Sequence, residues 1–247
     1  MSELAMALRS LPRIERLDLA VLTLPEWHPE ASNQPTAPVY GYVIDHPEGP
    51  IVVDTGVGFG NDFIDEVYQP ECVRLDGALG AVGIEASSIV GVVNSHLHFD
   101  HCGQNPLLYG TDVPFFLQQL ELDEVERDRF YTDPEWALPP AAQRRLLGGD
   151  FEMAEGVTIL STPGHTPGHQ SVVVESTAGR VVVAGQAVWA LEEFVDEQVT
   201  VSNVFSDEFH DLAIDSIRRI KALKPQAVYF AHCAADRPND GPQAAEQ

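Results

Sequence analysis

The sequence predicts an α/β fold made of two similar halves in a single domain. Apolar, strand-like runs end at the polar residues Asp54, His96, His165, Gln186 and His232. The segment Gly49-Pro50-Ile51-Val52-Val53-Asp54-Thr55-Gly56 is echoed by Gly179-Arg180-Val181-Val182-Val183-Ala184-Gly185-Gln186. No linker separates the halves, and 247 residues can bury a substantial core. We therefore interpret residues 1–247 as one domain with peripheral ends at residues 1–14 and 234–247.

The first half consists of strands and turns. Four prolines between Pro25 and Pro38 predict a loop, and the turn His46-Pro47-Glu48-Gly49-Pro50 between two apolar runs predicts a hairpin. The strands expected are Glu15–Leu24, Val39–Ile44, Ile51–Val53 and Ile89–Asn94, with a helix at Asp76–Val82.

The second half begins with Gln118–Asp150, which is charged and aromatic and predicts a mainly helical region over the site. Its Phe130, Tyr131 and Trp136 either contact a substrate chain or pack in the core. Strands are expected at Val157–Leu160, Ser171–Glu175, Arg180–Ala184 and Ala227–Phe230, and Ile214, Ile217 and Ile220 have helical spacing.

The charge balance argues against some partners. Fourteen Lys and Arg against 38 Asp and Glu give a net charge of −24, which repels phosphate backbones and anionic lipid. We therefore expect no nucleic acid and no membrane partner. The sequence has no run of 18 apolar residues, so we also expect no membrane span. Three scattered cysteines and a start without a secretory signal favour the cytoplasm. Oligomeric state is not readable from the sequence.

A dense cluster of metal-ligand residue types lies at His96-Leu97-His98-Phe99-Asp100-His101. Imidazole suits zinc and similar divalent ions, and a carboxylate adds the negative charge that a cation needs. Three histidines and an aspartate within six residues therefore predict a metal site, with Asp100 and His101 able to address a second ion.

Two further histidines follow predicted strands and are candidate ligands. His165 projects from the Thr162-Pro163-Gly164-His165 turn, and His232 follows Val228-Tyr229-Phe230-Ala231. We expect a structural role for His169, hydrogen bonds to the ligand loops from Asp54, and surface positions for His28, His46 and His210. Cys102 and Cys233 are expected to pack rather than to bind metal.

The HxHxDH pattern from His96 to His101 resembles the signature of the metallo-β-lactamase superfamily. With Val53-Asp54-Thr55-Gly56 upstream and His165 and His232 downstream, the order of the motifs is similar as well. Within the superfamily the chain most resembles the N-acyl homoserine lactonases, through Ser95–His101, the repeated Thr-Pro-Gly-His followed by Gln170-Ser171, and Ile217-Arg218-Arg219-Ile220. The similarity spans roughly residues 15–235.

The resemblance implies a four-layer αββα sandwich and a metal-dependent hydrolase that opens lactone or ester rings, with N-acyl homoserine lactones as candidate substrates. It also implies one or two zinc ions, with manganese or iron as alternatives. His96, His98 and His165 would bind the first ion, and Asp100, His101 and His232 the second. A hydroxide generated by the metals would attack the carbonyl, and Asp100 would act as the catalytic residue that delivers a proton to the leaving alkoxide.

Two positions depart from the family pattern. The aspartate that bridges both metals in the family is replaced by Gln186, and the lactonase tyrosine three residues later is replaced by Trp189. A neutral amide is a poorer bridge than a carboxylate, so we predict weaker binding of at least one ion, and tighter binding after Gln186→Asp. Trp189 either donates its N–H to the substrate or simply lines the pocket.

These departures leave other functions open. A glyoxalase II-like thioesterase shares the HxHxDH and His165 motifs, and a thiolate leaves without a general acid. A non-hydrolytic relative that keeps the metal for structure or sensing is the alternative outside the enzymes.

Overall fold

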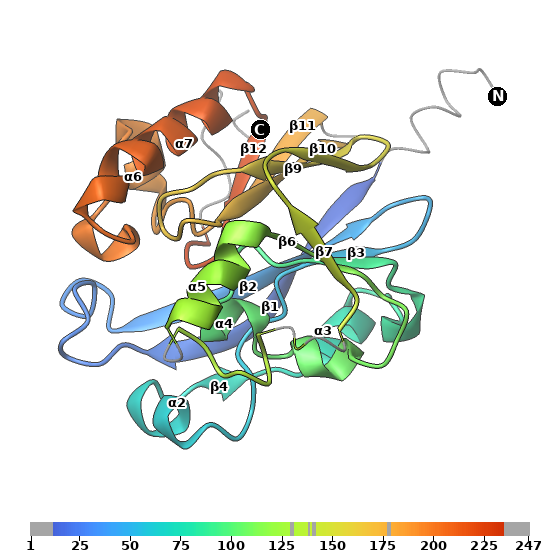
Figure 1. Ribbon diagram of the computed structural model, residues 1–247, viewed down its shortest axis with the longest axis horizontal. Helices are drawn as coiled ribbons and strands as arrows, with labels where there is room; N and C mark the ends of the chain where they lie inside the picture. The colour runs from blue at the N-terminus through green and yellow to red at the C-terminus, as the bar shows by residue number, and fades with distance from the viewer. Residues whose placement is uncertain (1–11, 129–130, 138, 140–141, 177–178, 235–247) are drawn as a thin grey trace, which may run out of the picture.

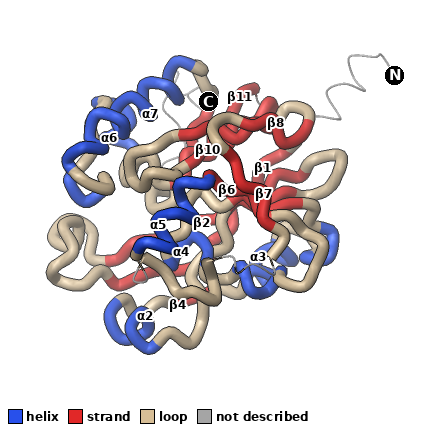
Figure 2. The backbone as a smooth tube through the Cα atoms, viewed as in Figure 1, coloured by secondary structure: helices blue, strands red, loops and turns tan. Residues whose placement is uncertain are grey.

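Two β-sheets form the middle of the molecule, and helices cover the outer face of each (Figures 1 and 2). The computed structural model describes residues 12–128, 131–137, 139, 142–176 and 179–234. One sheet has seven strands in the order β4-β1-β2-β3-β5-β6-β7, and the other has five in the order β12-β11-β10-β9-β8.

Each sheet is built largely from strands that are close in sequence. The strands of the first sheet are β1 (Arg13–Thr23), β2 (Thr36–Asp45), β3 (Ile51–Val53), β4 (Glu71–Cys72), β5 (Gly91–Val93), β6 (Phe115–Gln118) and β7 (Arg144–Leu147). The strands of the second are β8 (Phe151–Ala154), β9 (Val157–Ser161), β10 (Gln170–Ser176), β11 (Gly179–Gly185) and β12 (Ala227–Phe230). The α-helices are α2 (Asp62–Val67), α3 (Leu75–Ala81), α4 (Phe99–Cys102), α5 (Gln119–Arg127), α6 (Leu191–Asp196) and α7 (His210–Ala222).

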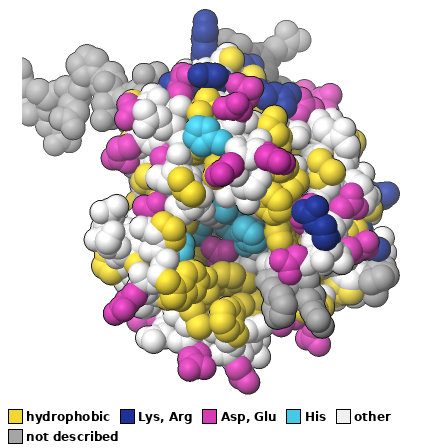
Figure 3. Space-filling view, turned by 60° about the vertical axis from the view of Figure 1, so that its left-hand side comes forward, with side chains coloured by type: hydrophobic (Ala, Val, Ile, Leu, Met, Phe, Trp, Pro, Cys, Tyr) yellow, Lys and Arg dark blue, Asp and Glu magenta, His cyan; other side chains and the backbone are white. Residues whose placement is uncertain are grey.

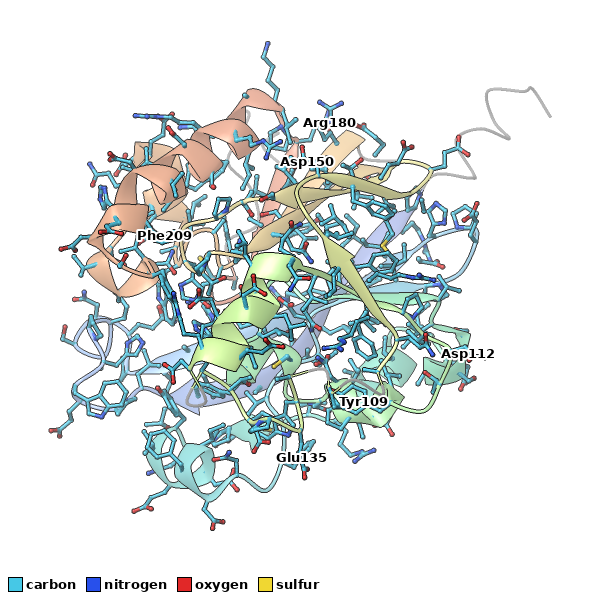
Figure 4. All side chains as sticks on the ribbon, viewed as in Figure 1. Tyr109, Asp112, Glu135, Asp150, Arg180 and Phe209 are labelled. Atoms are coloured by element: carbon cyan, nitrogen blue, oxygen red, sulfur yellow. The ribbon has the colours of Figure 1, made fainter. Side chains whose placement is uncertain are left out.

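Three separate apolar cores hold these layers together, and side chains of both sheets fill the space between them (Figure 4). Ile51 of β3 and Val172 of β10 belong to the core between the sheets. Leu79 of α3 lies in the core on the outer face of the first sheet. Ile217 and Ile220 of α7 pack against the second sheet. Three cores between four layers confirm the expected αββα sandwich.

The strands and helices expected from the sequence are present within a few residues of their predicted bounds, except in Gln118–Asp150. There the helix α5 ends at Arg127, and β7 then pairs with β6 in parallel, so the prediction of a mainly helical region was wrong. The sequence of β7 is Arg-Arg-Leu-Leu, which carries no clear strand pattern, and its partner β6 is distant in sequence, so local periodicity does not reveal the pairing. Trp136 is buried in the outer core, and Phe130 lies outside the described residues.

The predicted peripheral ends, residues 1–14 and 234–247, fall mostly outside the described residues, although Arg13 and Ile14 already belong to β1. Within the part of the chain that the structure describes, no helix is both long enough and apolar enough to cross a membrane.

The strand ends of the two sheets converge at one edge of the sandwich. The parallel strands β3 and β5 lead to Asp54 and Asn94, and the parallel strands β11 and β12 lead to Gln186 and Ala231. Gly185 has a positive φ of 60°, and a Cβ there would lie 2.9 Å from the Ser95 Cβ. A glycine is therefore needed where the second sheet meets the loop that follows β5.

Candidate metal centre

Six side chains from three loops and the short helix α4 meet where the strand ends converge. His96 and His98 follow β5, Asp100 and His101 lie in α4, His165 follows β9, and His232 follows β12. Their ligand atoms form two groups, His96 with His98 and His165, and Asp100 with His101 and His232. Within each group the ligand atoms lie within 4.8 Å of one another. The structure thus brings together all six residues that were predicted from the sequence as metal ligands.

In the first group, three imidazole nitrogens face one another. The His98 Nδ1 lies 3.0 Å from the His96 Nε2 and 3.0 Å from the His165 Nε2. The Ser95 hydroxyl donates to Asp54, so it accepts from the His96 Nδ1 at 3.1 Å. The His96 Nε2 is consequently the unprotonated nitrogen, and its lone pair points at the group.

In the second group, three lone pairs converge. The His101 Nδ1 donates to Asp54 at 2.8 Å and the His232 Nδ1 donates to the Pro38 carbonyl at 2.8 Å. When both rings are neutral, both Nε2 atoms are acceptors, and each lies 3.1 Å from the Gln186 Oε1. Without a metal, His101 takes up a second proton on its Nε2, which then donates to that oxygen. The Asp100 Oδ2 lies 3.7 Å and 3.4 Å from the same nitrogens. A divalent ion is the partner that satisfies such a set of oxygen and nitrogen donors, so the residues fit one.

Burial and neighbouring charges set the protonation of the donors in the metal-free protein. Burial lowers the pKa of His98 and of His232 to about 4, and together with the neighbouring imidazoles it holds the pKa values of His96 and His165 well below their ordinary range. These four histidines are neutral at pH 7 and ready to bind an ion. Burial also lowers the pKa of His101, but the Asp100 and Asp54 carboxylates outweigh it and raise the pKa to about 9.

Asp100 is the one carboxylate among the six donors. Burial raises its pKa, but the surrounding imidazoles outweigh burial and leave the pKa below the ordinary value. Asp100 is therefore ionised at neutral pH. The first group has no carboxylate at all, so the negative charge that attracts a cation is concentrated in the second.

Asp54 supports the second group, as its position after β3 led us to expect. Its carboxylate accepts from the Ser95 backbone N–H at 2.6 Å, from the Ser95 hydroxyl at 2.7 Å and from His101 at 2.8 Å. Asp54 has a positive φ of 61°, an uncommon conformation for a residue other than glycine, which turns its side chain toward the ligand loop. Three hydrogen bonds to the carboxylate offset this strain, and the one from the His101 Nδ1 fixes the tautomer of that ring.

His169 has a supporting position. Its Nδ1 donates to the Thr162 carbonyl at 3.0 Å, and its Nε2 accepts from the Gln186 backbone N–H at 3.2 Å. Both ring nitrogens are thus occupied by backbone groups, and the imidazole links the His165 loop to the segment that presents Gln186.

Sequence reasoning missed a buried acid that ties the ligand loops together. Glu121 of α5 accepts hydrogen bonds from the Leu97 backbone at 2.9 Å, the Thr166 hydroxyl at 2.7 Å and the Tyr131 hydroxyl at 2.5 Å. Burial raises the pKa of Glu121. Its three partners lie 10, 24 and 45 residues away in sequence, so no local pattern identified it.

A cavity of about 320 Å³ lies over the two donor groups. On this face of the molecule histidine and acidic side chains lie at the bottom of a hollow with apolar side chains at its rim (Figure 3). His98, Asp100, His165 and Gln186 contribute to the cavity wall. Its other lining residues are Leu22, Leu24, His28, Phe63, Tyr68, Phe99, Tyr131, Trp189 and Ser202.

Trp189 lines this cavity beside the second group. Its ring stacks on His232, with centroids 4.5 Å apart. Its indole N–H donates to the Gln34 side chain at 3.3 Å. The N–H that could have replaced the phenol of a tyrosine is therefore bound within the protein, which supports the pocket-lining interpretation.

The other histidines correct two expectations. His28 is half-buried and lines the cavity, and His46 is buried with its Nε2 3.0 Å from the Glu155 carbonyl, so neither has the expected surface position. Both were misjudged because prolines and glycines marked their segments as loops, yet these loops fold back onto the protein. His210 is exposed, as expected.

The cysteines are free. Cys102 is buried in the outer core with its thiol 3.4 Å from the Leu97 carbonyl, and burial raises its pKa. Cys233 is half-buried against the core below α7. Neither belongs to the two donor groups.

Comparison with known proteins agrees with this geometry. The sequence model of the metallo-beta-lactamase superfamily matches residues 35–232 of this chain. The N-acyl homoserine lactonase of a Bacillus species is 32% identical over 212 residues, which cover 79% of this chain and 81% of that protein. The N-acyl homoserine lactonase AiiA of Bacillus thuringiensis subsp. kurstaki is also 32% identical, over 213 residues, with the same coverage.

Solved structures lead to the same family. A crystal structure of a B. thuringiensis AiiA mutant with N-decanoyl-L-homoserine bound at the active site has a TM-score of 0.75 and 29% identity, and covers 91% of this chain and 94% of that one. An N-acyl homoserine lactone hydrolase with the product N-hexanoyl-L-homoserine bound at its catalytic metal centre has the same TM-score, identity and coverage. The resemblance seen in the motifs is thus confirmed, and the chain belongs to the metallo-β-lactamase superfamily, in the branch of the N-acyl homoserine lactonases.

Proposed function

We propose that this protein is a metal-dependent hydrolase that opens a lactone ring, with N-acyl homoserine lactones as its substrates. The observation that carries the proposal is the juxtaposition of two metal-binding groups with a partly apolar cavity. The similarity to N-acyl homoserine lactonases, which extends over most of the length of those proteins, supports the proposal. A polar lactone ring fits above the donor groups, and an acyl chain fits against Leu22, Leu24 and Phe63.

The metal ligands in this proposal are His96, His98 and His165 for one divalent ion, and Asp100, His101 and His232 for the other, with zinc the metal that imidazole-rich sites favour. When bound, the ions supply Lewis acidity toward the ester carbonyl and toward water. The protein supplies the orientation: Asp54 and Pro38 hold the histidines of the second group in the tautomer that binds metal.

Asp100 is the residue to which we assign proton transfer. It lines the cavity and is ionised at neutral pH, so its carboxylate can accept a proton from the attacking water. Once the ring ester bond breaks, the same carboxyl group can return that proton to the alkoxide oxygen. Trp189 cannot take this role because an indole N–H does not transfer a proton.

Gln186 makes the two ions unequal in this proposal. Its amide oxygen lies among the donors of the second group but brings no charge, so only the Asp100 carboxylate and the more distant Asp54 offset a pair of dications. Electrostatic attraction is therefore strongest in the second group. We propose that the Asp100 group fills first and that the three-histidine group binds its ion more weakly.

The test is a substrate panel with zinc, manganese or iron(II) supplied: N-acyl homoserine lactones, simple γ-lactones and an acyl-glutathione. Turnover of lactones with release of one acid equivalent supports the proposal. Turnover of acyl-glutathione alone identifies a thioesterase, which needs no general acid for its thiolate. Metal uptake without turnover of any of them identifies a non-hydrolytic binding protein.

A further inference from the structure

The cavity contains one imidazole that is outside both donor groups. His28 belongs to the loop between β1 and β2, which folds over the cavity and is held by the Ser202 hydroxyl donating to Glu30 at 2.8 Å. The ring of His28 contacts Trp189, with centroids 5.6 Å apart.

The hydrogen bonds of the loop fix the tautomer of His28. Its Nδ1 accepts from the Glu30 backbone N–H at 3.2 Å. Burial lowers the pKa of His28, so the ring is neutral at pH 7 and carries one proton, which must be on Nε2. No described residue accepts a hydrogen bond from this Nε2–H. The ring therefore offers a preformed donor, held in place by the backbone.

Most other polar groups on the wall have their donors occupied. The Trp189 indole N–H donates to Gln34, the Ser202 hydroxyl to Glu30, and the Tyr131 hydroxyl to Glu121. Tyr68 keeps a hydroxyl, but a hydroxyl rotates, whereas the direction of the His28 N–H is set by its other nitrogen.

The position of His28 determines which acceptor it can meet. The ring of His28 lies against Trp189, whose ring in turn stacks on the buried His232 of the second donor group. The reacting carbonyl must lie at the donor groups themselves. A group that binds His28 is therefore about one aromatic ring away from the reacting carbonyl, which is where a substituent of the lactone ring lies.

We propose that His28 is a specificity-determining residue whose Nε2–H donates to the carbonyl oxygen of an acylamino substituent on the lactone. The inference rests on the proposed lactonase function and deepens it, because it distinguishes acylamino lactones from alkyl lactones. A neutral donor suits an amide carbonyl, and this hydrogen bond would be absent from a γ-lactone that carries only an alkyl chain.

The experiment compares N-hexanoyl homoserine lactone with an alkyl γ-lactone of similar chain length. His28→Phe keeps the aromatic contact with Trp189 and removes the donor, His28→Gln keeps an N–H donor, and His210→Phe is a matched control at an exposed histidine. A lost neutral hydrogen bond lowers affinity by roughly fivefold to tenfold. We expect His28→Phe to raise KM for the acylamino lactone by that factor, to leave the alkyl lactone within about twofold, and to be partly rescued by His28→Gln.

The metal content and melting temperature of each variant are measured alongside, so that a loss of activity caused by misfolding is distinguished from a change in specificity. Equal losses on both lactones, or no loss on either, overturn the inference while leaving the lactonase proposal intact. A selective loss in Tyr68→Phe but not in His28→Phe overturns it as well. If the wild-type protein opens neither lactone, the proposed function fails and the inference fails with it.

Discussion

Mild acid should unfold the metal-free protein, because five buried histidines are neutral in the folded state. The pKa values of His98 and His232 are lowered to about 4 and that of His169 to about 3, chiefly by burial, and those of His96 and His165 are also well below the ordinary value. In the unfolded chain each would titrate near pH 6.5. Stability is therefore present above pH 6.5 and is lost as the pH falls from 6.5 toward 4.

The magnitude follows from the number of groups. At pH 5.5, one unit below the unfolded pKa, each neutral histidine costs about 1.4 kcal/mol of stability, so five cost about 7 kcal/mol. That is comparable with the whole free energy of unfolding of a typical domain, roughly 5–15 kcal/mol. Glu121 opposes the loss, because its pKa is raised by burial. His101 also opposes the loss, because its pKa is raised to about 9 and its stabilising contribution increases as the pH falls from 7.5 through the unfolded value near 6.5.

Urea unfolding of the protein after removal of metal by a chelator, followed at pH 7.5, 6.5 and 5.5, measures the effect. We expect the free energy of unfolding to fall by several kcal/mol between the first and last pH. A fall of less than about 2 kcal/mol at constant urea dependence would refute the assignment of all five histidines as neutral, since together they lose about 7 kcal/mol before the opposing contributions of Glu121 and His101.

Three further predictions concern the metal centre. Gln186→Glu places a negative charge at the position of the present amide, and Gln186→Asp places one on a shorter side chain. Both variants should bind metal at least tenfold more tightly in chelator competition. Unchanged affinity in both would show that the neutral amide does not limit metal binding. Asp54→Asn removes the acceptor that fixes His101 and should weaken binding by roughly 10-fold to 100-fold, whereas Asp45→Asn, at an exposed ion pair with Arg13, should not. Since the pKa of His101 is about 9, filling the second group at pH 7.5 should release close to one proton, measurable by calorimetry in buffers of different ionisation enthalpy.

The donor set could be predicted from the sequence because its members occur in short motifs that follow strands. The six residues from His96 to His232 come together because parallel strands of each sheet end at the same edge. The repeated pattern of Gly49–Gly56 and Gly179–Gln186 identified these ends correctly, with β3 and β11 in different sheets.

Residues that act across long sequence distances were missed. Glu121 lies in a charged helix with no neighbour in sequence that shows its role, and it gains its function from backbone and hydroxyl donors of two other loops. His28 was placed at the surface because prolines surround it, whereas the loop folds over the cavity. Loop closure depends on contacts such as Ser202 to Glu30 that no local pattern encodes.

The second donor group has a consequence for the order in which the protein is made. Asp100 and His101 are synthesised before β11 and β12, whereas His232 follows β12, which pairs with β11. A nascent chain therefore presents two of the three ligands of this group, next to an incomplete second sheet, before the third has been made. The second group therefore cannot bind its ion with all three ligands until β12 has been made and has paired with β11.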